Sequence, residues 1–132
     1  MSADDAGRWN ARYQQGWHSG APQPREVLLR AAKLFQPGGL VLDLAMGMGA
    51  NACWLLKNGF RVVGVDVSSV AVQFAKRQSQ DLMAFIGDLG EYHFPPSVFS
   101  AVLNFYFLDR SVLRDLSRIL IPNGFAVVET LT

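Results

Sequence analysis

Acidic residues and glycines follow two of the apolar segments of this chain, and their spacing points to a ligand. Asp43 precedes Gly47 and Gly49, and Asp66 comes 19 residues after Gly47. Glycines let a backbone approach a ligand closely, and the start of the next helix favours an anionic group, phosphate or carboxylate. A carboxylate such as Asp66 can accept hydrogen bonds from both hydroxyls of a ribose. The spacing therefore predicts a site for an adenosine-containing ligand; the alternatives are a tight turn and an Asp66 that helps to cap the helix after Ser68.

Asp43 separates two classes of adenosine-containing cofactor. A nicotinamide-binding fingerprint is apolar up to its first glycine and has a third glycine, whereas this segment carries an acid within the apolar run and lacks that glycine. A buried carboxylate needs a partner. A ligand ammonium group is one candidate, and backbone N–H groups are the structural alternative.

The elements that must position these residues alternate between strand and helix. A helix is expected after Pro24, with Val27, Leu28, Ala31, Leu34 and Phe35 on one stripe. Apolar runs predict five strands at 40–45, 60–66, 82–88, 98–107 and 125–131, with helices between them. This order predicts an α/β, Rossmann-like, doubly wound and mostly parallel sheet, whose ligands bind at the carboxyl ends of the strands.

Composition narrows the class of protein further. The 132 residues carry 12 Lys+Arg and 11 Asp+Glu, so the basic excess usual in nucleic-acid binders is absent. Cys53 is the single cysteine and is expected to be a core residue, so no intrachain disulfide forms. No leader and no membrane span are recognisable. We expect a soluble, cytoplasmic domain.

Several segments together resemble the class I S-adenosylmethionine-dependent methyltransferases, and most closely their tellurite-resistance-type, small-molecule branch. The likeness rests on DLAMGMGAN and WLLKNGFRVVGVDVS, with support from RWNARY, GDL, VLNFYFL and IPNGFAVVET. It implies one domain over 1–132, with an N-terminal helical cap at 1–36 and a Rossmann-like core at 37–132. It also implies the strand order 3-2-1-4-5. We expect this chain to depart from the family in lacking the usual C-terminal hairpin after the fifth strand.

The resemblance also implies roles for residues around the cofactor's amino-acid part. Asp43 would hold the methionine ammonium group. The glycine-rich loop would lie against the methionine through Ala45, Gly47 and Gly49, and Ala45 stands where the family usually has glycine. At the end of the fourth expected strand, Asn104 and Phe105 would pass beside the same moiety.

Further residues would hold the nucleoside. The resemblance implies that Asp66 binds both ribose hydroxyls and that Val67 packs against adenine. Asp88 would accept a hydrogen bond from the adenine amino group, and the Leu89 backbone N–H would meet a ring nitrogen. Without the family, Val67 is a core residue and Asp88 a polar strand end.

The activity implied is direct, in-line methyl transfer to a small-molecule acceptor, without a metal. General-base candidates, where the acceptor needs one, are Tyr106, Asp109, His18 and His93. Tyr106 and Arg110 could shape the acceptor site. The rivals are a binding module without turnover, acting by assembly or sensing, and a nicotinamide-dependent oxidoreductase. A nucleic-acid methyltransferase is disfavoured because 104–107 reads NFYF, not Asn-Pro-Pro-Tyr.

Two surfaces remain to be placed. Trp9, Tyr13 and Trp17 could form a lid over the cofactor or pack an N-terminal helix within 7–20 onto the sheet. The fifth strand, 125–131, would be an apolar edge with unpaired backbone groups, and the missing helix would leave a face bare. We therefore expect a homodimer that buries this edge or face.

Overall fold

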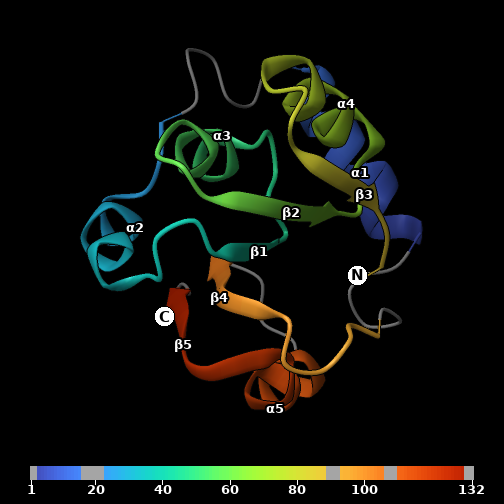
Figure 1. Ribbon diagram of the computed structural model, residues 1–132. Helices are drawn as coiled ribbons and strands as arrows, with labels where there is room; N and C mark the ends of the chain where they lie inside the picture. The colour runs from blue at the N-terminus through green and yellow to red at the C-terminus, as the bar shows by residue number, and fades with distance from the viewer. Residues whose placement is uncertain (1–2, 16–22, 89–92, 106–109, 130–132) are drawn as a thin grey trace.

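A five-stranded parallel sheet forms the centre of the computed structural model, which describes residues 3–15, 23–88, 93–105 and 110–129. Its strand order is β3-β2-β1-β4-β5, as expected from the sequence (Figure 1). The strands are β1 (Leu40–Leu44), β2 (Arg61–Asp66), β3 (Met83–Ile86), β4 (Phe99–Phe105) and β5 (Leu120–Glu129). All four strand pairs are parallel.

Helices cover both faces of the sheet, so the doubly wound prediction is confirmed (Figure 1). One face carries α2, its 3-10 extension η1, α3 and α4, while α5 lies on the other face, and α1 packs against α4. The helices are α1 (Ala3–Gln14), α2 (Glu26–Ala31), η1 (Ala32–Leu34), α3 (Ala50–Lys57), α4 (Ser69–Gln78) and α5 (Arg110–Ile119).

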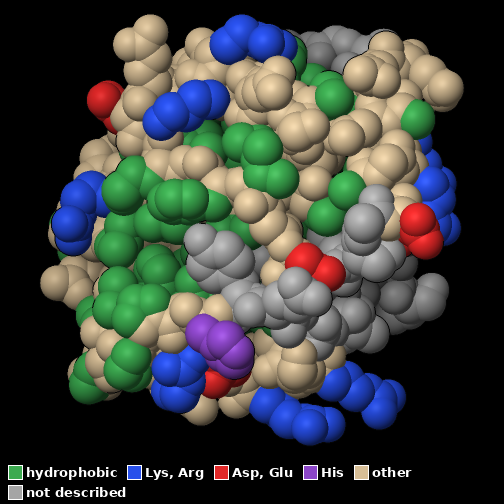
Figure 2. Space-filling model, turned by 90° about the vertical axis from the view of Figure 1, so that its right-hand side faces the viewer, with side chains coloured by type: hydrophobic (Ala, Val, Ile, Leu, Met, Phe, Trp, Pro, Cys, Tyr) green, Lys and Arg blue, Asp and Glu red, His purple; other side chains and the backbone are tan. Residues whose placement is uncertain are grey.

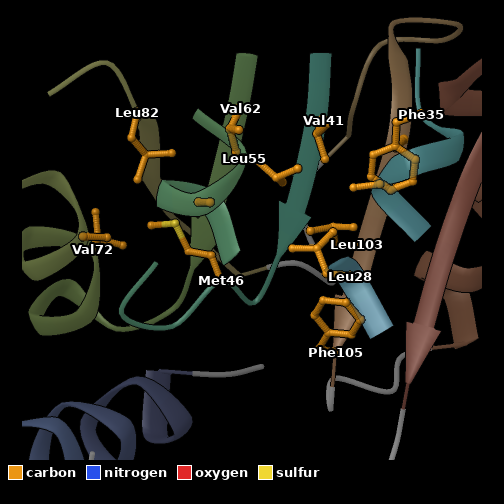
Figure 3. Close-up of a cluster of buried hydrophobic side chains, with 14 residues drawn as sticks. Leu28, Phe35, Val41, Met46, Leu55, Val62, Val72, Leu82, Leu103 and Phe105 are labelled. Carbon is orange, nitrogen blue, oxygen red and sulfur yellow. The ribbon is translucent and has the colours of Figure 1, made fainter. Parts of the chain in front are cut away.

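The core divides into two clusters, one on each face of the sheet. Successive strand residues point to opposite faces, so Val41 and Leu103 belong to one cluster while Leu42 and Val102 belong to the other. Figure 3 shows the first cluster, in which Leu28 of α2 lies beside the end of β4. Strands buried on both faces are typical of parallel sheets. The same alternation decides which way each polar side chain points at the strand ends.

Local signals set the helix boundaries near these strand ends. The Ser68 side chain accepts a hydrogen bond from Ala71 N at 3.2 Å and so caps α4, as predicted. α3 ends at Lys57, and Gly59 follows in the left-handed conformation at φ 89°, which agrees with the predicted stop at 58–59.

The N-terminal helices differ from the sequence prediction. α1 begins at Ala3 and ends at Gln14, earlier than the segment 7–20 predicts. Leu34, expected on the buried stripe of the next helix, is 66% exposed. α2 gives way to a 3-10 turn at Ala32, and the change from 3.6 to about 3 residues per turn rotates Leu34 off that stripe.

β5 begins five residues earlier than predicted. Leu120 pairs with Phe99, whereas Phe125 pairs with Ala101, so three extra residues lie in β5 across this shift of register. The predicted turn at 122–124 therefore forms inside the strand as an irregularity, with Asn123 at φ 66°.

Both edges of the sheet expose large apolar side chains. β5 exposes Phe125 and Val128, and β3, which the sequence analysis did not single out, exposes Met83, Phe85 and Ile86. Figure 2 shows hydrophobic side chains gathered on part of the side where β3 lies. Within the ranges described, no helix combines the length and apolar character needed to cross a membrane.

Candidate functional site

Three buried polar side chains lie at the carboxyl ends of the central strands: Asp43 on β1, Asp66 on β2 and Asn104 on β4. The register pairs Asp43 with Gly64 and with Leu103, and Leu44 with Asn104. Register partners in a parallel sheet point to the same face, and successive residues alternate. Asp43 and Asp66 therefore point to the face covered by α3 and α4, and Asn104 points to the face of α5.

Asp66 is held by backbone donors on both of its oxygens. Gly47 N donates to Oδ2 at 2.8 Å, and Ser68 N donates to Oδ1 at 2.9 Å. Burial raises the pKa of Asp66, and the N–H groups of Ser68, Gly47 and Val67 offset part of that effect. The carboxylate is fixed in orientation, and each oxygen has a further lone pair with which to accept a hydroxyl. Asp66 thus also takes part in the turn into α4, which was the structural alternative.

Asp43 lacks such support. It is 1% exposed, and its Oδ2 has no hydrogen-bond partner in the described part of the chain. Burial first, and then the neighbouring Asp66 carboxylate, raise the pKa of Asp43 to about 8. Buried oxygens of this kind normally have a donor. For Oδ2, the expected alternative of backbone N–H partners is not observed, and a cationic donor would complete it.

The loop between β1 and α3 takes the left-handed conformation at three positions. Ala45, Gly47 and Gly49 have φ values of 55°, 59° and 84°. A Cβ atom on Gly49 would lie 2.6 Å from Ala75 Cβ, so this glycine also allows α4 to approach closely. Ala45 adopts a conformation that glycine takes without strain. The departure from glycine at Ala45 therefore has a cost in backbone energy.

Helix α1 reaches this loop through Tyr13. A Cβ atom on Gly47 would lie 3.0 Å from the Tyr13 hydroxyl, which places that hydroxyl over the loop. Burial first, and then the Asp66 carboxylate, raise the pKa of Tyr13, and Trp9 stacks on its ring with centroids 5.7 Å apart. Asn10 Oδ1 accepts from Ser68 Oγ and from Val70 N. α1 is thus fastened to the start of α4 and covers the glycine loop.

Asn104 is the third buried group, and its amide is unsatisfied. The residue is 1% exposed, and neither its side-chain nitrogen nor its side-chain oxygen has a hydrogen-bond partner among the described residues. Its register partners are Leu44 on β1 and Val128 on β5. A donor and an acceptor therefore lie together in an apolar environment.

The other expected residues are distributed around the strand ends. Val67 is buried directly after β2, Asp88 is half-buried after β3, and Phe105 is buried in the cluster drawn in Figure 3. Arg110 begins α5 and is exposed, as is His93. Leu89, Tyr106, Asp109, His18 and Trp17 lie outside the described residues. Residues 3–15, 23–88, 93–105 and 110–129 contain no cluster of three His, Cys, Asp or Glu side chains suited to a metal ion.

A second cluster, not predicted from the sequence, lies at the same end of the sheet. Arg25 N donates to Asn51 Oδ1 at 2.8 Å, and the Arg25 guanidinium forms an ion pair with Glu129. That guanidinium also lies over the Phe105 ring, 5.9 Å from its centroid. Arg25 and Glu129 are 104 positions apart, so no local pattern could have revealed the pair.

Cys53 is half-buried in α3, and burial raises the pKa of its thiol. A raised pKa keeps the sulfur protonated and poorly nucleophilic.

A protein family and several known proteins match parts of this chain. Residues 41–124 match the family described as methyltransferase domain. A demethylmenaquinone methyltransferase from Beutenbergia cavernae is 35% identical over 99 residues, which cover 70% of this chain and 41% of that protein. A 23S rRNA (uracil(747)-C(5))-methyltransferase from Pyrococcus abyssi is 41% identical over 54 residues, or 41% of this chain and 13% of that protein.

Solved structures match more of the chain. A TehB-like SAM-dependent methyltransferase from Corynebacterium glutamicum superposes with a TM-score of 0.72 at 22% identity. The match covers 96% of this chain and 73% of that one. Of the two curated relatives named above, by contrast, the chain spans less than half of the length. The chain therefore belongs to the methyltransferase domain family and shares its fold with the solved TehB-like SAM-dependent methyltransferase.

Proposed function

We propose that this chain binds S-adenosylmethionine and transfers its methyl group to a small-molecule acceptor. The observation that carries the proposal is the buried Oδ2 of Asp43, which has no partner among the described residues and lies one strand away from the fixed carboxylate of Asp66. An ammonium group would give Oδ2 its missing donor, and ribose hydroxyls would use the free lone pairs of Asp66. The polar groups of the cofactor thus fit the donors and acceptors of this face.

The proposed cofactor contacts follow the sequence prediction except at Asn104, which we assign to the acceptor because its side chain points to the face opposite Asp43. Asp43 holds the ammonium group, and the loop of Ala45, Gly47 and Gly49 lies against the methionine. Adenine packs on Val67, and the Asp88 carboxylate accepts from its amino group. We further propose the division into an N-terminal cap, 1–36, and a core, 37–132; the Tyr13 hydroxyl beside Gly47 supports it.

The bound sulfonium supplies an activated methyl group, so the protein has to orient the acceptor and exclude water. The buried amide of Asn104 points to the face opposite Asp43 and Asp66. An acceptor that approaches from that face would meet both a donor and an acceptor there. Arg110 and Tyr106 stay candidates for binding the acceptor.

A small-molecule acceptor is favoured over RNA by two observations. The matched demethylmenaquinone methyltransferase covers 70% of this chain, whereas the matched rRNA methyltransferase covers 41%. The net charge of +1 offers little attraction to a phosphate backbone.

Calorimetric titration with S-adenosylmethionine and S-adenosylhomocysteine tests the cofactor. We expect micromolar binding to the wild-type chain, a loss of at least tenfold in Asp66→Ala, and unchanged binding in Asp81→Ala, whose carboxyl group is exposed. A folded wild-type chain that binds neither compound overturns the proposal. If the chain binds S-adenosylmethionine but forms no S-adenosylhomocysteine with a panel of hydroxylated, amino and thiol acceptors, it is a binding module without turnover.

We also propose a homodimer in the cytoplasm. Phe125 and Val128 are exposed on the edge strand β5, and pairing of two copies would cover them. Analytical ultracentrifugation should give twice the chain mass, and Val128→Lys should shift it to the monomer. A wild-type chain that stays monomeric at high concentration contradicts this assembly. If Phe85→Lys dissociates the dimer and Val128→Lys does not, the two copies pair through their β3 strands instead.

A further inference from the structure

The amino-acid part of the proposed cofactor carries two opposite charges, and only one of them has a partner so far. Asp43 offers its carboxyl oxygen to the ammonium group. The α-carboxylate needs a cation on the same face of the sheet. This inference rests on the proposed function, because it concerns the binding of the same cofactor.

Arg25 lies on that face and at the same end of the sheet. Phe105, under its guanidinium, is two residues beyond Leu103, which is the register partner of Asp43. Two strand residues span about 7 Å and point to the same side. Asp43 and Arg25 thus flank a short stretch of β4, which matches the small size of an α-amino acid group.

The backbone of Arg25 is hydrogen-bonded to the first turn of α3. Its N–H donates to Asn51 Oδ1, two residues beyond Gly49 at the start of α3. The N-terminal turn of a helix favours an anion through its dipole and free N–H groups. A carboxylate placed beside Arg25 would therefore lie close to a second source of positive potential.

Arg25 is already paired, and its partner can be replaced. The Arg25 and Glu129 side chains are 34% and 37% exposed, so solvent screens their ion pair. Glu129 is half-buried at the end of β5, whereas Phe105 and Asp43 are buried. A ligand carboxylate that offers a planar, bidentate partner can take the place of the Glu129 carboxylate.

We propose that Arg25 binds the α-carboxylate of the cofactor and that Glu129 competes for the same guanidinium. Two variants that each remove one charge of this ion pair then have opposite effects. Arg25→Gln removes the binding group and weakens binding. Glu129→Gln releases Arg25, removes a repulsive carboxylate and tightens binding.

The test is calorimetry with two ligands, S-adenosylhomocysteine and its analogue that lacks the α-carboxylate. We expect Arg25→Gln to weaken binding of S-adenosylhomocysteine about tenfold and that of the analogue less than twofold. Glu129→Gln should tighten the first about threefold and leave the second unchanged. Arg30→Gln, which breaks an exposed ion pair with Glu26 on α2, is the matched control and should change neither.

Each other outcome contradicts the inference. If Arg25→Gln weakens the binding of both ligands equally, Arg25 has a purely structural role. If Glu129→Gln weakens binding, Glu129 does not compete with the ligand for Arg25. If thermal melting shows that Arg25→Gln does not fold, Glu129→Gln and Arg25→Lys provide the test. Lysine keeps the charge but not the paired N–H donors of the guanidinium. Arg25→Lys should therefore lose part of its affinity for S-adenosylhomocysteine and keep its affinity for the analogue. A wild-type chain that binds neither ligand instead overturns the proposed function.

Discussion

Two regions of the same site differ in how far the protein satisfies its own polar groups. Around Asp66, both carboxyl oxygens accept backbone N–H groups, and Gly47 and Ser68 hold them in place. At the ends of β1 and β4, by contrast, Asp43 Oδ2 and the whole amide of Asn104 have no partner within the described ranges. The carboxyl oxygens of the first region are hydrogen-bonded without a ligand. The buried polar atoms of the second region lower the stability of the folded chain as long as no ligand binds them. Substitutions that disturb the contacts of the first region should therefore lower the free energy of unfolding, whereas removal of the unsatisfied polar atoms of the second region should raise it.

The largest effect is expected from the titration of Asp43. Its pKa is about 8 in the folded chain and 3.8 ordinarily, so between these values the folded state holds a proton that the unfolded state has released. Stability should fall as pH rises from 5 to 7, by up to about 1.4 kcal/mol per pH unit, and level off above 8. Urea unfolding across this range measures it.

Asp43→Asn is the control for this slope. It should be markedly flatter, with a remainder from Asp66, whose pKa is also raised. An unchanged slope would assign the proton elsewhere. Ammonium binding should expel the proton, so the titration enthalpy of S-adenosylhomocysteine at pH 7 should depend on the buffer in the wild type and not in Asp43→Asn.

Gly49→Ala tests how tightly the first region is built. The added Cβ meets Ala75 Cβ at 2.6 Å, and φ is 84°, so we expect a loss of about 3 kcal/mol in urea unfolding. Gly59→Ala shares the positive φ, at 89°, but its Cβ meets nothing within 4 Å, and it should cost about 1 kcal/mol. Equal losses would mean that the contact with α4 contributes nothing.

Asn104→Leu tests the second region. It removes two buried polar atoms that have no partner in the described part of the chain, and it keeps a similar volume, so the unfolding free energy should rise by about 1 kcal/mol. Methyl transfer to the eventual acceptor should fall, while affinity for S-adenosylhomocysteine stays within about threefold.

Ser100→Ala supplies the contrast on the same strand. The Ser100 hydroxyl donates to Leu40 O at 3.1 Å, so its removal should cost about 1 kcal/mol. A loss of stability in Asn104→Leu similar to that in Ser100→Ala would show that the amide is satisfied in solution.

Ala45→Gly gives the smallest change. Its left-handed φ of 55° is strained for alanine, so glycine should stabilise the chain by about 0.5 kcal/mol after the entropy of the unfolded glycine is subtracted. Ala52→Gly, inside α3, should instead lose about 1 kcal/mol in the same urea experiment. A loss in both would mean that the loop gains nothing from glycine.

Alternation of strand and helix predicted the parallel sheet, the family resemblance predicted its strand order, and the apolar runs placed Asp43 and Asp66 at strand ends. It could not predict the cluster of Arg25, Asn51 and Glu129, since those side chains meet only in the folded chain. It also could not predict which buried groups stay unsatisfied. That property depends on which face each residue takes, and a single residue of register decides it.

Periodicity failed where the local geometry changes. Leu34 fits a helical stripe, but a 3-10 turn rotates it into solvent. The segment 122–124 has turn residues, but its neighbours continue as one strand because Leu120 and Phe125 both pair with β4. Local propensity describes these segments correctly, and tertiary pairing decides the element around them.

Ser68 belongs to two hydrogen-bond systems at once. Its N–H donates to Asp66, and its hydroxyl donates to Asn10 of α1. Motions that detach α1 from α4 thus loosen one support of the Asp66 carboxylate, and a molecule that fixes this carboxylate slows the same opening. Deuterium uptake by the amides of residues 3–15 should consequently slow when a ligand binds Asp66, although α1 ends more than fifty residues before Asp66 in the sequence.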